Sequence, residues 1–369
     1  MKKILAIDVL SIEIPFRRAF AHALNAHRAS RPQLIRVSLS GGDVGWGEAQ
    51  PREYVTGETI CSVRDTVRAL NEQWQGIEVS SLESASMLLR GSPYRTKCPA
   101  AFAGVELALL DAVGRAEKRN VTEVLGSVKT EMLLYDGAVL GFLPASAFGM
   151  ALMRVKKLGK RVIKLKVGRE GDKERIAVTR RILGDDIRIV LDANGAWSAD
   201  EAIEQIRSFD EHRIDAVEQP VAREDIEGMA LVRRSVAPSI VADESICTLD
   251  DARRLVAAKA ADILNIRVGK CGGLLASLEL IEYAREHNLG TNLGVMVGET
   301  GIAGTAGRLL AACAPDIGDR EFDSSGNAEL DVLRSPLAAI HENRAPLPPL
   351  LPGLGYDVDA ALVGSVLSA

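Results

Sequence analysis

The stretch Arg188-Ile-Val-Leu-Asp192-Ala-Asn194 decides the fold, because its form, a short apolar run that ends in a polar group, occurs five times in the chain. The five polar groups are Lys166, Asp192, Glu218, Asp243 and Lys270. The spacings between successive groups are 26, 26, 25 and 27 residues. A strand of about five residues, two short loops and a crossover helix together take roughly that length. The spacing therefore predicts one strand–helix unit for each polar group.

The parallel strands of a closed barrel point in one direction, so residues at their carboxyl ends meet at one mouth. We expect Asp192, Glu218 and Asp243 to meet there between two lysines. Three carboxylates suit a hard divalent cation such as Mg²⁺, which keeps its other positions for water or substrate. The lysines suit proton transfer, and Lys164, on the same strand face as Lys166, would make that ammonium easier to deprotonate.

The motifs around these groups resemble those of the enolase superfamily, in the muconate-lactonizing subgroup. In that subgroup Lys-x-Lys ends the second barrel strand, Asp-x-Asn the third, Glu-Gln-Pro the fourth, Asp-Glu-Ser the fifth and Lys-x-Gly-Gly the sixth. All five occur here in the same order: Lys164-Leu-Lys166, Asp192-Ala-Asn194, Glu218-Gln-Pro, Asp243-Glu244-Ser and Lys270-Cys-Gly-Gly. The resemblance covers nearly the whole chain, and the subgroup includes muconate cycloisomerases, dipeptide epimerases and N-acylamino acid racemases.

The resemblance implies an α/β fold, a modified TIM (β/α) barrel with an α+β N-terminal capping domain. It also implies that the three carboxylates bind one Mg²⁺, for which Mn²⁺ can substitute, with Asn194 and Glu244 behind them. Lys166 and Lys270 would face opposite sides of the substrate's α-carbon. Removal of the α-proton gives an enediolate, which the metal and the lysine charges stabilise.

Three parts of the chain are expected. Residues 1–130 contain a β-hairpin over residues 33–48 and helices, the clearest from Ala101 to Glu117, and would form the capping domain. Residues 131–329 alternate strands and helices as a (β/α)7β-type barrel whose last strand lies near 320–323. Residues 330–369, rich in proline and leucine, would return to the capping domain.

Substrate choice in the superfamily depends on two loops of the capping domain and on the last two barrel strands. In the cap loops, His22, Arg28 and Arg52 could meet a second carboxylate, since arginine offers bidentate geometry, or could belong to solvated basic loops. Tyr54 lies in the second loop. The barrel candidates are Glu299 and Thr300 after strand seven, where the Met-x-Glu run common in the subgroup is one residue longer here, and Glu321 and Asp323 after strand eight.

Glu321-Phe-Asp323 stands where dipeptide-epimerizing members carry an Asp-x-Asp that holds the substrate's α-ammonium group. Alternate residues of a strand share one face, so both acids could counter a cation. The leading hypothesis is therefore a racemase or epimerase of a dipeptide or an N-acyl amino acid. The first alternative is a cycloisomerase, or a syn-dehydratase of the o-succinylbenzoate synthase type, acting on a dicarboxylate with a single base.

Two further classes stay open, a metal-free Schiff-base aldolase and a non-catalytic binding protein. None of the five histidines lies near the end of strand seven, where the mandelate-racemase branch carries its base. The net charge of −5 gives no indication of nucleic-acid binding, and no apolar run reaches the length of a membrane span. We expect a cytoplasmic enzyme with a small carboxylate substrate, assembled as a homo-oligomer as most soluble enzymes are.

Overall fold

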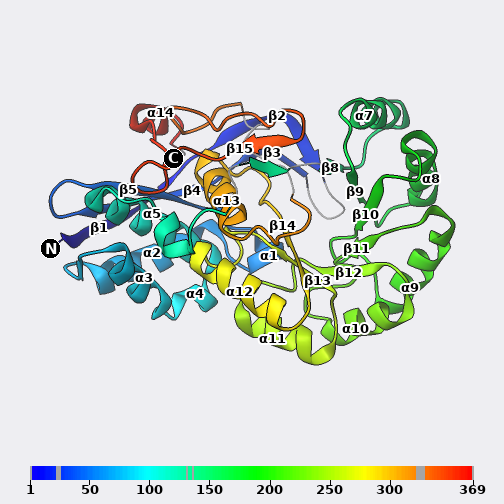
Figure 1. Ribbon diagram of the computed structural model, residues 1–369, viewed down its shortest axis with the longest axis horizontal. Coiled ribbons are helices and arrows are strands. Elements are labelled where there is room, and N and C mark those ends of the chain that lie inside the picture. Colours follow the sequence, from blue (N-terminus) through cyan, green and yellow to red (C-terminus); the bar gives the residue numbers. More distant parts are fainter. Residues whose placement is uncertain (1, 22–25, 130–131, 135–136, 321–328, 368–369) are drawn as a thin grey trace.

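Two units lie side by side in the computed structural model, which describes residues 2–21, 26–129, 132–134, 137–320 and 329–367. Figure 1 shows an antiparallel sheet with helices at one end of the molecule and a curled parallel sheet ringed by helices at the other. The expected barrel with an α+β N-terminal unit is confirmed. The exact domain boundaries stay a prediction.

The N-terminal unit is built on a four-stranded sheet in the order β5-β4-β1-β6. Its strands are β1 (Lys2–Ser11), β4 (Gln33–Leu39), β5 (Val44–Ala49) and β6 (Glu78–Val79), and a separate ribbon pairs β2 (Ile14–Ala21) with β3 (Ala26–Ser30). The predicted hairpin is β4 and β5, joined through Gly41 and Gly42, whose φ angles of +115° and +91° favour glycine.

The helices of this unit are α1 (Glu53–Thr56), α2 (Ile60–Trp74), α3 (Leu82–Arg90), α4 (Tyr94–Lys97), α5 (Pro99–Glu117) and α6 (Thr122–Leu125). The predicted helix at residues 101–117 is α5, which begins two residues earlier at a proline in the first turn. Nearly every side chain of α5 is buried. The helix packs directly on β5, since a Cβ atom on Gly45 or Gly47 would collide with the α5 backbone.

Within the described part of the chain, the barrel sheet has seven parallel strands that follow one another in chain order. They are β8 (Gly137–Leu140), β9 (Val162–Lys166), β10 (Arg188–Asp192), β11 (Ala216–Glu218), β12 (Ser239–Ala242), β13 (Ile263–Ile266) and β14 (Gly290–Leu293). The helices that follow them are α7 (Ala145–Lys157), α8 (Asp172–Leu183), α9 (Ala199–Ser208), α10 (Ile226–Ser235), α11 (Leu249–Ala258), α12 (Leu274–Glu286) and α13 (Gly301–Cys313), with a 3-10 turn η1 (Asp210–His212) after α9.

The expected eighth strand lies mostly outside the described residues, which stop at Arg320 and resume at Glu329. Arg320 forms a parallel bridge with Leu293 at the end of β14, and its carbonyl oxygen lies beside Gly137 of β8. The last part of the chain returns to the N-terminal unit. Its β15 (Arg344–Pro346) pairs with β7 (Met132–Leu134), and α14 (Ala360–Ser365) leads to a bridge between Leu367 and Ile12.

Side chains of the barrel strands alternate between two environments, as a period of two requires. One cluster fills the inside of the barrel: Val162, Val190, Ala216, Val241 and Ile263. Their immediate neighbours, such as Ile163 and Leu191, pack outward in the main hydrophobic core. The residues two positions further along therefore point inward at the carboxyl ends of the strands. None of the helices that the structure describes is both long and apolar enough to cross a membrane.

Candidate active site

The carboxyl ends of β9 to β12 bring the predicted polar groups to one edge of the sheet. In the strand pairing, Asp192 is level with both Lys166 and Glu218, while Asp243 lies two residues beyond Val241, the partner of Glu218. The carboxylates are buried, with exposures of 1% for Asp192, 1% for Glu218 and 0% for Asp243. Carboxylates are rarely buried unless they are paired, so their partners define the site.

Lys166 stands on one side of the group. Its ammonium donates to Asp192 Oδ2 at 2.6 Å and to Asn194 Oδ1 at 2.8 Å, and Asn194 Nδ2 donates to Glu244 Oε1 at 3.0 Å. Burial is the largest influence on Lys166 and opposes its charge, and Lys164 acts in the same direction. The charges of Asp192 and Glu218 and the hydrogen bond to Asp192 nevertheless raise the pKa of the lysine. The structure therefore brings Lys164, Lys166, Asp192, Asn194 and Glu244 together, as the sequence predicted.

The backbone after these strands adopts conformations that side chains rarely favour. Asn194 and Gln219 have φ angles of +46° and +40°. Gln219 uses that position to receive the backbone N–H groups of Asp243 and Ser245 at 3.0 and 3.1 Å. Such local strain persists where the surroundings fix it, and here it sets the direction of the Asp243 loop.

Glu218 lies between two cations, one on β9 and one directly after β13. Lys164 Nζ is 2.7 Å from Glu218 Oε2, and Asn265 Nδ2 donates to Oε1 at 3.2 Å. Arg267, directly after β13, places Nη2 at 3.9 Å from the same Oε1. The charge of Glu218 is thus shared between β9 and β13.

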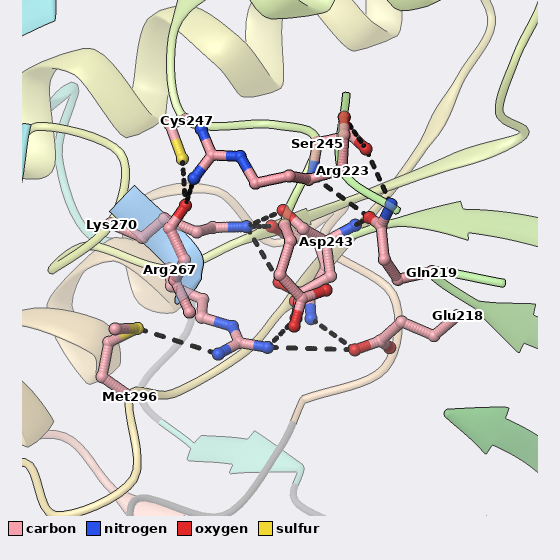
Figure 2. A network of polar contacts seen from close by, with 12 residues as sticks. Glu218, Gln219, Arg223, Asp243, Ser245, Cys247, Arg267, Lys270 and Met296 are labelled. Carbon is pink, nitrogen blue, oxygen red and sulfur yellow. Dashed lines mark hydrogen bonds and ion pairs between the residues drawn. The ribbon is translucent and has the colours of Figure 1, made fainter. Parts of the chain in front are cut away.

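Asp243 is held by two cations at once, as Figure 2 shows. Arg267 Nη2 pairs with its Oδ2, and Lys270 Nζ donates to its Oδ1 at 2.9 Å. Burial would raise the pKa of the Asp243 carboxyl, but Arg267 and Lys270 together hold that pKa well below its usual range. Burial and the neighbouring Asp243 and Asp192 carboxylates raise the pKa of Glu244 to about 7.

Asn265 and Arg267 both contact Glu218, and the sequence analysis predicted neither. The motif Lys270-Cys-Gly-Gly matches the family pattern, whereas Arg267 belongs to no such motif. The alternation of the strand would have found it, since Ile263, Asn265 and Arg267 fall on one face. In Figure 2 its guanidinium extends between Met296 and Glu218.

The chemistry of the donor set fits a hard divalent cation. Three buried carboxylates lie on neighbouring strand ends, and two acceptor atoms beside them, Glu244 Oε2 and Asn265 Oδ1, find no hydrogen-bond partner among the residues described. In the present arrangement, however, lysine and arginine side chains occupy the carboxylates, and the described residues hold no converged group of three acids, histidines or cysteines. A metal would have to displace these cations.

The second cap loop reaches the barrel mouth. The carbonyl of Val55 in α1 accepts from the Arg223 guanidinium and from Cys247 Sγ at 3.8 Å, which fixes α1 on the barrel loops. Its neighbour Tyr54 is half-buried, and the loss of solvent around its phenol raises the pKa of that group against the charges of Arg52 and Arg267. Arg52 donates from Nη2 to the carbonyl of Val297 at 2.8 Å.

The other predicted substrate contacts are placed differently. Glu299 turns back on its own loop and accepts the N–H of Met296 at 2.8 Å, and Thr300 donates its hydroxyl to Glu48 at 2.7 Å. Both therefore hold the strand-seven loop in the structure as it stands. Arg28 is exposed on β3. His22, Glu321 and Asp323 lie outside the described residues.

Comparison with known proteins gives a consistent result. The model of a protein family described as enolase C-terminal domain-like matches residues 149–362. The chain is 29% identical to the hydrophobic dipeptide epimerase of Enterococcus faecalis, over 89% of this chain and 92% of that protein. It is 27% identical to the N-succinyl-L-Arg/Lys racemase of Bacillus cereus, over 97% of this chain and 96% of that one.

Among solved structures, the dipeptide epimerase from Enterococcus faecalis V583, complexed with Mg and the dipeptide L-Leu-L-Tyr, is similar over 96% of this chain and 99% of that one. The TM-score is 0.85 and the sequence identity is 28%. The likeness therefore includes both the N-terminal unit and the barrel.

Proposed function

The chain belongs to the enolase superfamily, in its muconate-lactonizing subgroup, and from this premise we propose that it removes the proton next to a substrate carboxylate with the help of Mg²⁺. The observation that carries the proposal is the position of Lys166. Its ammonium lies beside Asp192 at the edge of three buried carboxylates, within the barrel mouth where a substrate would enter. A lysine in that place is a base poised next to a cation site.

Asp192, Glu218 and Asp243 would hold the metal. Bound Mg²⁺ would supply a Lewis acid that neutralises the substrate carboxylate and stabilises negative charge on it. Asn194 and Glu244 support this set, because Asn194 connects Glu244 to Lys166 through two hydrogen bonds. Mn²⁺ has similar ligand preferences and should replace Mg²⁺.

Lys166 must be neutral when it takes the proton. While Asp192 is paired with it, the pKa of the lysine is raised, so the base is inactive in that arrangement. Once Asp192 is engaged elsewhere, burial and the charge of Lys164 both favour the neutral amine. Lys164 therefore acts as a positioning residue that tunes Lys166.

We propose that the substrate is a dipeptide or an N-acyl amino acid and that the reaction is epimerization or racemization at its α-carbon. The names of the two relatives support this choice of substrate class. Arg52 and Tyr54, held at the mouth by the second cap loop, are the described candidates for contacts to the substrate. Arg28, His22, Glu299, Thr300, Glu321 and Asp323 remain predicted contacts.

A second candidate is a cycloisomerase or syn-dehydratase that acts on a dicarboxylate. The presence of Arg267 at the mouth favours it, because one base suffices for these reactions and a guanidinium suits a second carboxylate. These reactions are distinguished by mass. Dehydration loses a water, whereas epimerization in H₂O leaves the mass unchanged.

The proposal is tested by incubating pooled dipeptides and N-acyl amino acids with the protein and Mg²⁺ in D₂O, followed by mass spectrometry. A gain of one deuterium on particular compounds, abolished by EDTA and by Lys166→Ala, is the expected result. Absence of exchange in these pools, with turnover of dicarboxylates instead, would establish the second candidate. Full activity after chelation would refute both and favour a Schiff-base enzyme.

A further inference from the structure

We infer that Arg267, rather than Lys270, is the positively charged group that faces the reaction space opposite Lys166. The inference rests on the proposed function and specifies how the two faces of the substrate differ. Lys166 ends β9 and Arg267 follows β13, and the three strands between them carry Asp192, Glu218 and Asp243. The two cations therefore flank the carboxylates.

The alternation of β13 places Arg267 inside the barrel. Ile263 packs against the interior cluster, and Asn265 lines a small interior cavity and donates to Glu218 at 3.2 Å. Arg267 is the next residue on that face, and it reaches both Asp243 and Glu218. Arg267 therefore lies on the inner face of the barrel, at the level of the three carboxylates.

Lys270 lies in the turn after β13, and its exposure is 0%. Its ammonium donates to the carbonyl of Asp243 at 2.6 Å, to Asp243 Oδ1 at 2.9 Å and to the carbonyl of Asn265 at 2.9 Å. An ammonium has three N–H donors, so these bonds use all of them. Lys270 ties the ends of β12 and β13 together and presents no donor to a substrate.

Gly294, directly after the neighbouring strand β14, leaves room for the guanidinium of Arg267. A Cβ atom on Gly294 would lie 2.5 Å from Asn265 Oδ1 and 3.0 Å from Arg267 Nε, so a larger residue would push both away. Met296 then places Sδ at 3.7 Å from Arg267 Nη1. The end of β14 is therefore shaped to hold an arginine at this position.

The identity of this cation changes the chemistry. A guanidinium stays protonated in proteins, so Arg267 can balance negative charge but does not exchange a proton with carbon. As the α C–H bond breaks, the proton passes to Lys166 Nζ and the electron pair moves into the carboxylate to give the enediolate. Lys166 can then return a proton, or a deuteron from D₂O, to the same face, whereas the proton for the opposite face must come from solvent and not from Arg267, so the proposed epimerization is slower than exchange.

We therefore expect exchange of the α-proton to outrun inversion. The test uses L-Leu-L-Tyr and the dipeptide that exchanges fastest in the D₂O screen, with deuterium gain measured by mass spectrometry and inversion by chiral chromatography. Exchange at least tenfold faster than inversion supports the inference, as does a ratio near one in Arg267→Lys. A ratio near one in the unaltered protein, with inversion selectively lost in Lys270→Met, would overturn it.

Mg²⁺ affinity, measured by isothermal titration calorimetry, gives a readout that does not need turnover. Because Arg267 occupies Asp243 Oδ2, Arg267→Met should bind Mg²⁺ several-fold more tightly, whereas Lys270→Met should lower the melting temperature without tightening the metal. Tighter binding in Lys270→Met alone would contradict the inference. If no variant exchanges any proton, the proposed function fails, and this titration still decides between the two cations.

Discussion

Two sets of buried carboxylates in this molecule share their residue types and their burial but differ in their partners. The mouth set consists of Asp192, Glu218 and Asp243, and each member is paired with a lysine or arginine side chain. The seam set consists of Glu48, Glu58 and Glu106, which the N-terminal unit contributes and which accept mainly backbone N–H groups. Burial alone therefore does not mark a functional carboxylate.

The side-chain carboxyl group of every member of the seam set lies at the amino end of a helix. Glu48 receives the N–H groups of Thr300 at 3.0 Å and of Ala303 at 3.2 Å at the start of α13. Glu58 receives those of Ala100 and Ala101 at 2.7 and 2.9 Å at the start of α5. These are the N–H groups that a helix leaves without an internal partner, and the positive end of its dipole favours an anion there.

Glu106 extends this arrangement across the junction between the two units. It lies on α5 and receives the N–H of Leu275 at 3.1 Å at the start of α12. Figure 1 places α12 and α13 between the barrel strands and the N-terminal helices, so Glu48 and Glu106 join the two units. Burial raises the pKa of all three seam carboxyls, and that of Glu106 reaches about 8.

The seam and mouth carboxyl groups differ in whether their partners can move. A helix end is part of the fold and its N–H donors cannot leave, so a seam carboxyl, whether charged or protonated, keeps its partners and stays where it is. A lysine or arginine side chain can rotate away, so a mouth carboxylate can change its partner for a metal or a substrate.

Glu218→Gln should abolish the proposed reaction, with exchange in D₂O falling by about 10³-fold or more, and should weaken Mg²⁺ binding at least about tenfold. The amide removes the charge that Lys164 and the metal share. Glu106→Gln is the matched control, since both residues are glutamates with 1% exposure. Loss of Mg²⁺ binding in the control as well would remove the distinction between the two sets.

Lys166→Ala should lower exchange by about 10²- to 10⁴-fold, the range of a lost general base. Mg²⁺ affinity, measured by calorimetry, should be retained or increased, because Asp192 loses its competing partner. Lys173→Ala, an exposed lysine paired with Glu211 on the outer surface, serves as the control. Weaker metal binding in Lys166→Ala would show that the lysine helps to build the metal site.

Glu48→Gln should destabilise the fold by about 1–2 kcal/mol without changing Mg²⁺ affinity. The amide nitrogen cannot accept from Thr300 or Ala303, so at least one helix N–H loses its acceptor. Denaturant unfolding measures the stability, and calorimetry measures the metal. A change in metal affinity comparable to that of Glu218→Gln would place Glu48 in the mouth set.

The pH dependence of stability should carry a contribution from Glu106. Its pKa rises from about 4.5 to about 8 on folding, so the folded state keeps a proton that the unfolded chain releases. This contribution is complete below pH 4.5 and is lost as the pH rises through 8. Glu106→Gln should therefore flatten the decline of the unfolding free energy between pH 5 and 9.

The exposed Glu72 on α2, changed to glutamine, provides the comparison for the titration of Glu106. Its curve should follow that of the unaltered protein. Equal slopes in Glu106→Gln and in the unaltered protein would mean that Glu106 stays ionised despite its burial.

The sequence located much of the candidate site because the relevant information is local. A period of two along each strand fixes which residues point inward, and the spacing of about one strand–helix unit brings successive strand ends to the same mouth. These rules predicted Lys164, Lys166 and Asp192, and the resemblance added Asn194 and Glu244. The structure joins Lys166, Asp192, Asn194 and Glu244 by hydrogen bonds and pairs Lys164 with Glu218. The family motifs added the chemistry.

The position of Tyr54 and the roles of Glu299 and Thr300 could not be obtained in this way. Tyr54 reaches the mouth because Val55 is held by barrel loops more than 160 residues away. The hydroxyl of Thr300 donates to Glu48, a residue of the N-terminal unit, and this contact holds the loop after β14. Such contacts depend on how the two units pack against each other. This packing produces no periodic pattern in the sequence of either unit.

The sequence by itself determined the strand–helix repeat, the inward polar layer and the family, because each depends on spacing along the chain. Only the tertiary structure distinguishes the surroundings of Arg267, which contacts Asp243 and Glu218, from those of Lys270, whose ammonium is enclosed between β12 and β13. Both follow β13, and the motif favoured the lysine, but a turn has no period that fixes where its side chains point. The choice depends on acceptors from β12 and on the space beside Gly294, which exist only once the strands have paired.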